Sequence, residues 1–255
     1  MIDFRVIVPF HNAAEFLPEC LESIAAQRGG FHARGYLVDD SSTDNWRDVV
    51  PSSVTDSAAM GFLAVTTPER GEELTSIVAG TALADRDVPL TDETVIVHVC
   101  GDDALAGPDA LARLADIYQD PDVWMTYGSF AYHGQTRSSG FCRALPPQAH
   151  QRGDYRARPW VTSHLRSYRV GLWRSIPPEQ LIDPTTGRLW QYGTDFAFMM
   201  PMLELARERA RFIPDVLYLY RKHGANIPPS LYGDPCRRIR AMPRLARLDS
   251  FAGVS

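Results

Sequence analysis

The sequence has few cysteines, and their positions favour neither a zinc site nor a disulfide framework. Cys20, Cys100, Cys142 and Cys236 are far apart and include no C-x-x-C pair. The chain also lacks an apolar run long enough to span a bilayer, and its first residues lack the segments of a secretory signal. We therefore expect a cytoplasmic protein without a transmembrane segment.

Two common nucleotide-binding motifs are also missing. Neither a Walker lysine nor a G-x-G-x-x-G sequence stands at the first predicted turn, which disfavours a nucleoside triphosphatase and an ordinary dinucleotide oxidoreductase. The formal net charge of -5 at pH 7 argues against indiscriminate polyanion binding by the whole surface. A chain of 255 residues with 45% hydrophobic residues suits one large globular α/β domain.

Short apolar runs alternate with segments of helical periodicity along the chain. Residues 4–9, 35–38, 61–65 and 94–99 are predicted strands, and residues 16–25, 74–84, 108–118 and 196–205 are predicted helices. This alternation predicts an α/β fold with a mostly parallel, Rossmann-like central sheet and flanking helices. Residues 132–173 have weak periodicity and are predicted to be rich in loops.

Polar residues follow three of the predicted strands. They are Pro9-Phe10-His11-Asn12, Asp39-Asp40-Ser41-Ser42-Thr43-Asp44 and Cys100-Gly101-Asp102-Asp103. Because the carboxyl ends of parallel strands meet at one edge of a sheet, these groups predict a cleft for a nucleotide. The alternative is a set of ordinary turns, with Asn12 as a helix N-cap.

Asp102 and Asp103 indicate a metal within this cleft. Adjacent carboxylates repel each other, and their position beside a buried strand is unfavourable unless a cation, basic groups or solvent compensates them. A divalent metal held between the carboxylates and the phosphates of a nucleotide meets this requirement. The alternative is a solvated turn that caps the helix beginning near Pro108.

Four segments stand in a distinctive order across most of the chain: Val6-Ile-Val-Pro-Phe-His-Asn12, Leu37-Val-Asp-Asp-Ser-Ser-Thr-Asp44, Gly101-Asp-Asp103 and Leu217-Tyr-Leu-Tyr-Arg-Lys-His223. This order resembles that of family 2 glycosyltransferases with the GT-A fold. The resemblance implies a GT-A domain over residues 1–230, in which residues 1–128 bind a nucleotide sugar and residues 129–230 bind the acceptor. Residues 231–255 would form a basic, helical extension.

The resemblance also implies roles for single residues. Contacts with a nucleotide-sugar donor, in the first instance a UDP-sugar, are implied for Pro9, His11, Asn12, Glu15, Asp39, Asp40, Asp102 and Arg221. Asp102, Asp103 and His223 would hold Mn²⁺ or Mg²⁺, which stabilises the departing nucleoside diphosphate. The alternative for His223 is a surface histidine in a basic segment.

Asp195 is the general base that the resemblance implies. It would remove the proton of an acceptor hydroxyl while that oxygen attacks the anomeric carbon from the face opposite the leaving diphosphate, so that the configuration inverts. The alternative is that Asp195 only caps the helix that it opens.

Three departures from the family pattern allow a different interpretation. Cys100 replaces the first aspartate of the usual Asp-x-Asp-Asp motif, the acidic pair near the base is reduced to Thr194-Asp195, and residues 75–80 lack an Arg-Asn pair. A thiolate is a poor partner for Mg²⁺ and suits softer metals. A catalytically silent nucleotide-sugar or glycan-binding protein is therefore the alternative to an enzyme.

Arginines alternate with aromatic residues over residues 137–174. Such a region suits a nucleic acid, including a modified base in DNA, but aromatic faces suit carbohydrates equally. Pairing of these arginines with acids, or with the donor diphosphate, is favoured over nucleic-acid binding. We therefore expect a saccharide or other hydroxyl acceptor, with a nucleic acid as the alternative.

A second basic stretch lies near the C-terminus. Its arginines, at residues 237–247, stand beside Leu245, Leu248 and Phe251, which follow helical spacing. This pattern predicts an amphipathic helix packed on the domain, in preference to one bound to an anionic membrane or a partner.

Overall fold

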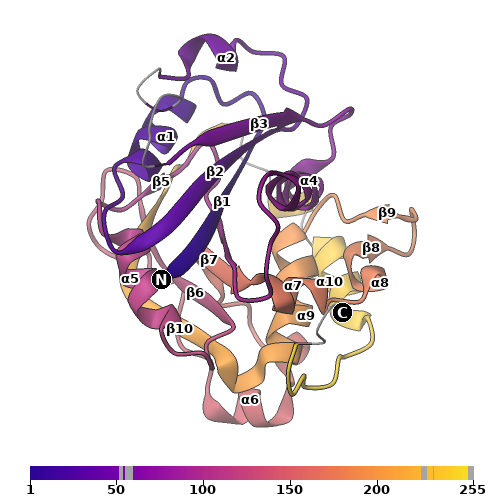
Figure 1. The fold of residues 1–255 in the computed structure, drawn as a ribbon. Helices are drawn as coiled ribbons and strands as arrows, with labels where there is room; N and C mark the ends of the chain where they lie inside the picture. The colour runs from indigo at the N-terminus through magenta and orange to yellow at the C-terminus, as the bar shows by residue number, and fades with distance from the viewer. Residues whose placement is uncertain (52–53, 55–59, 225–228, 232, 252–255) are drawn as a thin grey trace.

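The computed structural model describes residues 1–51, 54, 60–224, 229–231 and 233–251. At its centre lies an eight-stranded sheet in the order β3-β2-β1-β4-β7-β6-β10-β5 (Figure 1). Its strands are β1 (Ile2–Phe10), β2 (Phe31–Asp39), β3 (Phe62–Thr66), β4 (Val95–His98), β5 (Ala104–Leu105), β6 (Met125–Tyr132), β7 (Ser163–Arg169) and β10 (Ala210–Tyr220). A separate antiparallel pair joins β8 (Ile182–Asp183) to β9 (Arg188–Leu189).

Most strands of the large sheet are parallel, as the sequence predicts. β1 pairs in parallel with β2 and β4, β2 with β3, and β6 with β10. β7 runs antiparallel between β4 and β6, and β5 runs antiparallel to β10. The carboxyl ends of β1, β2, β4, β6 and β10 therefore share one edge with the amino end of β7.

Helices flank this sheet (Figure 1). They are α1 (Leu17–Ala25), α2 (Trp46–Val49), α4 (Glu72–Asp87), α5 (Ala110–Tyr118), α6 (Pro147–Arg152), α7 (Val170–Arg174), α8 (Pro178–Leu181), α9 (Thr194–Ala206) and α10 (Gly233–Ala241). The apolar residues of α1 and α5 pack in one core cluster, and those of α4, α7 and α9 pack in the other. Each face of the sheet is thus covered by its own set of helices.

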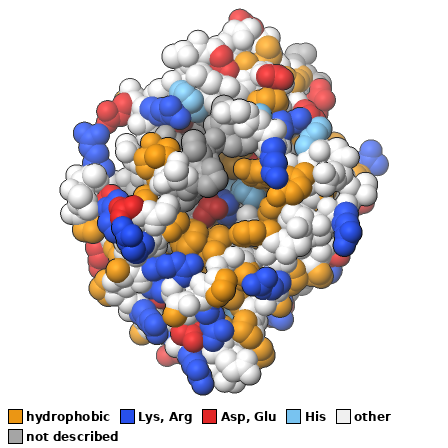
Figure 2. All heavy atoms as spheres, turned by 180° about the vertical axis from the view of Figure 1, so that it is seen from behind, with side chains coloured by type: hydrophobic (Ala, Val, Ile, Leu, Met, Phe, Trp, Pro, Cys, Tyr) orange, Lys and Arg blue, Asp and Glu red, His pale blue; other side chains and the backbone are white. Residues whose placement is uncertain are grey.

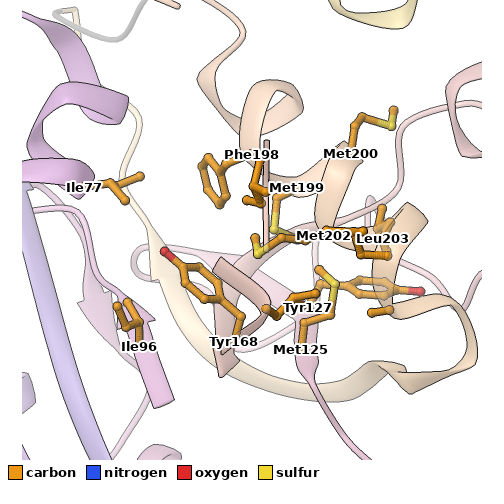
Figure 3. Close-up of a cluster of buried hydrophobic side chains, with 14 of the residues drawn as sticks. Ile77, Ile96, Met125, Tyr127, Tyr168, Phe198, Met199, Met200, Met202 and Leu203 are labelled. Carbon is orange, nitrogen blue, oxygen red and sulfur yellow. The ribbon is translucent and has the colours of Figure 1, made fainter. Parts of the chain in front are cut away.

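Alternate residues of the central strands enter different core clusters. Val6 and Val8 of β1 join the cluster of α1 and α5, while Ile7 between them joins the cluster of α4 and α9. Figure 3 shows the second cluster, where Tyr168 lies near Ile96 and the ring centroid of Phe198 is 6.4 Å from that of Tyr168. Burial on both faces explains why these strands are continuous apolar runs in the sequence.

The prediction that residues 132–173 are mainly loop is wrong for their second half. This region contains α6, α7 and most importantly β7, which is buried along its whole length. β7 has a polar sequence because its buried polar groups have partners: Ser167 Oγ lies 2.6 Å from Thr126 Oγ1, and Arg169 Nε donates to the carbonyl of Val123 at 2.8 Å. Satisfied polar groups can be buried, so hydrophobic periodicity does not reveal this strand.

The C-terminal region matches its prediction only in part. Residues 233–241 form α10, but residues 242–251 contain no helix, so the helix predicted around Leu245, Leu248 and Phe251 is wrong. These apolar side chains still pack on the core: Leu248 N donates to the carbonyl of Leu205 at 3.0 Å, and the ring of Phe251 lies 4.3 Å from that of Trp124. The segment that contains Leu248 is therefore held by a backbone hydrogen bond to the end of α9, and it forms no helix of its own.

Among the described residues, no helix is both long and apolar enough to cross a membrane.

Candidate active site

The turns after β1 and β2 are joined by hydrogen bonds. His11 Nδ1 lies 2.8 Å from the carbonyl of Asp40, and Asn12 Oδ1 accepts from the amide of Thr43 at 2.7 Å. Asn12 adopts a positive φ of 48° and does not cap α1, whose N-cap residue is Phe16. The N-cap interpretation of Asn12 is therefore wrong, and the residue instead holds two strand-end turns together.

Asp39 and Asp40 are buried at the end of β2, and both carboxylates have internal donors. Asp39 accepts from the amide of Ser42 at 2.8 Å and from the indole of Trp46 at 3.1 Å. Burial raises the pKa of Asp39, but these hydrogen bonds outweigh it and hold the pKa below its usual value. Asp40 Oδ1 accepts from the amide of Gly71 at 2.8 Å. The two carboxylates therefore order the walls of the predicted nucleotide cleft.

The turn after β4 is pressed against the end of β1. Gly101 N donates to the carbonyl of Pro9 at 2.9 Å, and a Cβ atom at Gly101 would lie 2.6 Å from Cβ of Phe10. Only glycine fits such a close approach, which joins the turn that carries Asp102 and Asp103 to the end of β1. Glu15, by contrast, lies exposed before α1.

Cys100, Asp102 and Asp103 form a compact group of metal-ligating atoms. One ligand atom from each residue lies within 4.8 Å of the other two. Asp103 is 2% exposed, and its carboxylate accepts from the Tyr218 hydroxyl at 2.6 Å and from the amide of Arg221 at 2.7 Å. Since these donors lie on β10 and just after it, Asp103 is not a solvated cap of α5, and that interpretation is wrong.

Asp102 is held from the segment that follows β10. His223 Nε2 lies 2.9 Å from Asp102 Oδ2, and Arg221 Nε donates to the carbonyl of Asp102 at 3.0 Å. The guanidinium of Arg221 also pairs with Glu19 of α1 at 2.5 Å. The structure therefore brings His223 and Arg221 beside Asp102 and Asp103, while the metal and donor roles that the sequence predicts for them stay predictions.

The chemistry of this group fits a divalent cation. Burial raises the pKa of Asp103 to about 8, and the nearby carboxylate of Asp102 raises it as well. Burial also raises the pKa of the Cys100 thiol well above its usual value, and so do the carboxylates around it. A cation at this position would relieve both effects, with two hard carboxylate oxygens and an imidazole beside a softer sulfur.

Asp195 stands in the first turn of α9 and does not cap it. The helix begins after Gly193, whose φ is 68° and where a Cβ atom would lie 3.1 Å from Cys236 Sγ. Asp195 Oδ2 instead accepts from Arg166 Nη2 of β7 at 2.5 Å. Its carboxylate is 29% exposed, which leaves it accessible at the edge of the sheet.

Arg166 binds a second carboxylate, that of Glu73 at the start of α4. Arg166 Nη1 lies 3.0 Å from Glu73 Oε1, and Thr194 Oγ1 donates to Glu73 Oε2 at 2.9 Å. Burial raises the pKa of Glu73 to about 7; the charge of Arg166 lowers it, and the carboxylate of Asp195 raises it. Two carboxylates from different helices therefore share one buried guanidinium.

A continuous series of contacts connects the metal group to Asp195. The ring of Tyr218, which donates to Asp103, stacks on His164 with centroids 4.5 Å apart and an interplanar angle of 10°. His164 Nε2 in turn lies 3.2 Å from Arg166 Nη2. The pKa of His164 lies well below its usual value because of burial and the nearby Arg166, so its neutral ring accepts this hydrogen bond. Asp103 and Asp195 thus belong to one site.

The surface of the molecule is hollowed on the face seen in Figure 2. Acidic, basic and histidine side chains lie inside the hollow, and hydrophobic side chains surround it. A concave site in which apolar side chains surround a few polar groups is typical of a small-molecule binding site.

The family model described as Glycosyl transferase family 2 matches residues 5–178, which is more than half of the chain. The chain belongs to glycosyl transferase family 2. The family predicted from the sequence is therefore confirmed. No sequence among curated proteins matches this family 2 chain.

Solved structures of low identity confirm the fold. TarS residues 1–349 from S. aureus, in complex with UDP-GlcNAc, has 16% identity and a TM-score of 0.60, over 88% of this chain and 60% of that one. The mannosyltransferase PcManGT from Pyrobaculum calidifontis, with GDP-Man and Mn²⁺, has 19% identity and a TM-score of 0.55, over 88% and 58%. Glucosyl-3-phosphoglycerate synthase from Mycobacterium tuberculosis, with Mn²⁺, UDP and glucosyl-3-phosphoglycerate, has 13% identity and a TM-score of 0.58, over 93% and 77%.

This family 2 chain thus spans about 60% of the length of the TarS structure. Its sheet and helices match the GT-A architecture, as predicted.

Five residues of the site are not predicted from the sequence: Glu19, Glu73, His164, Arg166 and Tyr218. Tyr218 carried a detectable signal, since it lies within the motif that ends at His223. In the sequence Arg166 is one of several arginines of a basic region, and Glu73 follows a loop with no strand-end pattern. Their relation to Asp195 depends on β7, the strand that was not predicted.

The arginines of residues 137–174 in this family 2 chain are largely paired. Arg156 pairs with Glu204, Arg158 with Asp154, and Arg174 with Asp85 and Asp92. Arg169 is buried and pairs with Glu93 at 2.5 Å. The expectation that these arginines neutralise acids of the chain is confirmed for these residues.

Proposed function

We propose that the protein is a metal-dependent, inverting glycosyltransferase that moves a sugar from a UDP-sugar to a hydroxyl of a saccharide acceptor. One observation carries this proposal: the contacts that join Asp103 to Asp195 through Tyr218, His164 and Arg166. They support the proposal because Asp103, which would serve the metal and the diphosphate, and Asp195, which would remove the proton, lie at the same edge of the sheet.

The donor would lie across the ends of β1, β2 and β4. Pro9, His11 and Asn12 would border the nucleoside, with Glu15 at the outer rim, and the ordered turn at Asp39 and Asp40 would face the base or ribose. Arg221 would add positive charge near the diphosphate. The structures of TarS with UDP-GlcNAc and of the mycobacterial synthase with UDP support a uridine nucleotide here.

Asp102, Asp103 and His223 would hold Mn²⁺ or Mg²⁺, and Cys100 would lie beside them. When bound, the cation supplies positive charge that stabilises the departing nucleoside diphosphate. The Mn²⁺ complexes of PcManGT and of the mycobacterial synthase support manganese.

Asp195 would accept the proton of the acceptor hydroxyl. The acceptor oxygen forms a bond to the anomeric carbon from one face, and the bond to the diphosphate oxygen breaks on the other, so the configuration inverts. Arg166 fixes the orientation of Asp195, and holding the reactants in this arrangement supplies a large part of the rate.

Paired arginines favour a saccharide over a nucleic acid as acceptor. A nucleic acid needs cations that are free to bind phosphates, whereas Arg156, Arg166 and Arg169 are buried and neutralised.

Substitution of Asp195 tests this function. With labelled UDP-sugars, a panel of saccharide acceptors and Mn²⁺, we expect transfer by the wild type, and donor binding without transfer by Asp195→Asn. Undiminished transfer by Asp195→Asn would exclude this residue as the base. Donor binding by the wild type without transfer to any acceptor would favour a silent binding protein instead.

A further inference from the structure

Glu73 and Asp195 compete for the same buried cation. Arg166 is 1% exposed, and its two terminal nitrogens contact different carboxylates, Nη1 that of Glu73 and Nη2 that of Asp195. The carboxylate of Asp195 also raises the pKa of Glu73. A change of charge on Glu73 therefore changes the environment of Asp195 directly.

Glu73 and Asp195 divide the positive charge of Arg166 between them. An ionised Glu73 neutralises part of the guanidinium and repels the carboxylate of Asp195, whereas a protonated Glu73 leaves the guanidinium to Asp195 alone. The ionisation of Glu73 therefore changes how strongly Arg166 holds Asp195.

We propose that Glu73 is a positioning residue that, through its shared contact with Arg166, controls how Asp195 is held for proton removal and so sets the pH at which sugar transfer begins. This inference rests on the proposed function, because it requires Asp195 to act as the base. In the usual family pattern a second acidic residue stands next to the base, where this chain has Thr194. The inference assigns that second carboxylate to Glu73 of α4, which is far from Asp195 in the sequence.

The groups that face Glu73 come from three parts of the fold. Arg166 approaches it from β7, Asp195 and Thr194 from α9, and the Cys100 thiol and the Tyr168 hydroxyl are close enough to feel its charge. Among these, Arg166 and the Thr194 hydroxyl favour the ionised form of Glu73, while Asp195 and burial favour the protonated form. Glu73 therefore changes its charge near neutral pH.

The proton balance of the transfer step is simple. Asp195 takes the hydroxyl proton as the new carbon–oxygen bond forms, and the diphosphate leaves with the electron pair of the broken bond. Glu73 and Asp195 then share this proton until water removes it.

Profiles of kcat/KM against pH for matched variants test the inference. For the wild type we expect kcat/KM to rise through a pH of about 7, where Glu73 ionises. In Glu73→Gln this rise should be lost, and kcat/KM above that pH should fall about tenfold. In Thr194→Val, which removes a hydrogen bond to ionised Glu73, the rise should move to higher pH. Glu73→Asp keeps a carboxylate at this position, so the rise of kcat/KM with pH that is lost in Glu73→Gln should be present in this variant.

Glu22→Gln is the matched control, because Glu22 is exposed on α1; it should leave the profile unchanged. A Glu73→Gln profile identical to that of the wild type would overturn the inference, and so would a Thr194→Val profile that does not move. Failure of the wild type to transfer any sugar, or full activity of Asp195→Asn, would instead refute the proposed function, so the two failures are distinguishable.

Discussion

The hydroxyl of Tyr218 lies 2.6 Å from Asp103 Oδ2 and 3.1 Å from the amide nitrogen of Cys100. The Tyr218 hydroxyl on β10 therefore contacts both Cys100 and Asp103, the first and last residues of the group of metal-ligating atoms that follows β4. It donates to the carboxylate and accepts from the backbone amide, which fixes the turn between them. Such support around a ligand orients it for the metal.

Removal of this hydroxyl should weaken metal binding. In Tyr218→Phe we expect the affinity for Mn²⁺, measured by calorimetry with UDP present, to fall by roughly 10–100-fold. Tyr36→Phe is the control, since Tyr36 donates to Asp87 at 2.8 Å, away from the metal group, and it should bind Mn²⁺ as the wild type does. Equal affinities of both variants would show that Tyr218 does not support the site.

Replacement of the Cys100 sulfur should change the preferred metal. Cys100→Asp adds a hard oxygen ligand beside Asp102 and Asp103, so binding of Mg²⁺ should improve by at least about tenfold relative to Mn²⁺. The ratio of the two dissociation constants measures this effect. Cys236→Ser, on α10, should leave the ratio unchanged. An unchanged ratio in Cys100→Asp would place position 100 outside the coordination sphere.

The buried pair of Arg156 and Glu204 should be essential for stability. Arg156 Nε lies 2.7 Å from Glu204 Oε1, and both side chains are almost fully buried. Arg156→Met leaves an uncompensated charge and should lower the free energy of unfolding by about 3–5 kcal/mol, whereas Arg156→Met with Glu204→Met should recover most of this loss. Arg113→Met, which breaks an exposed pair with Asp215, should cost less than about 1 kcal/mol in the same denaturant titration.

The raised pKa of Glu73 predicts a dependence of stability on pH. The folded state holds the proton of Glu73 up to a pH of about 7, above the usual value of 4.5, so its contribution is present below pH 4.5 and is lost as the pH rises through 7. Relative to Glu73→Gln, the wild type should lose up to about 3 kcal/mol across this window. Unfolding free energies at both ends of the window measure it, and a constant difference would contradict the assignment.

The fold could be predicted because its strands and helices are strongly patterned. β1 and β4 are buried on both faces and read as apolar runs, and α1 repeats apolar residues at helical spacing. β7 could not be predicted in this way, because hydrogen bonds let Arg166, Ser167 and Arg169 be buried inside the sheet.

The residues of the candidate site also differ in whether the sequence predicts them. The groups at the ends of β1, β2 and β4 could be predicted, since parallel strands bring their carboxyl ends together. The contacts of Glu73 and His164 depend on β7 and on how α4 and α9 approach it, and these are tertiary relations without a local sequence pattern. The roles of the predicted donor and metal residues stay predictions until ligands are bound.

Calorimetric titration of the protein with UDP-sugars, with and without Mn²⁺, tests the central claim most directly. We predict binding of at least one UDP-sugar by the wild type that depends on Mn²⁺ and weakens by more than about a hundredfold in Asp103→Asn. Failure of the wild type to bind any nucleotide sugar, in the presence or absence of Mn²⁺, would contradict the account.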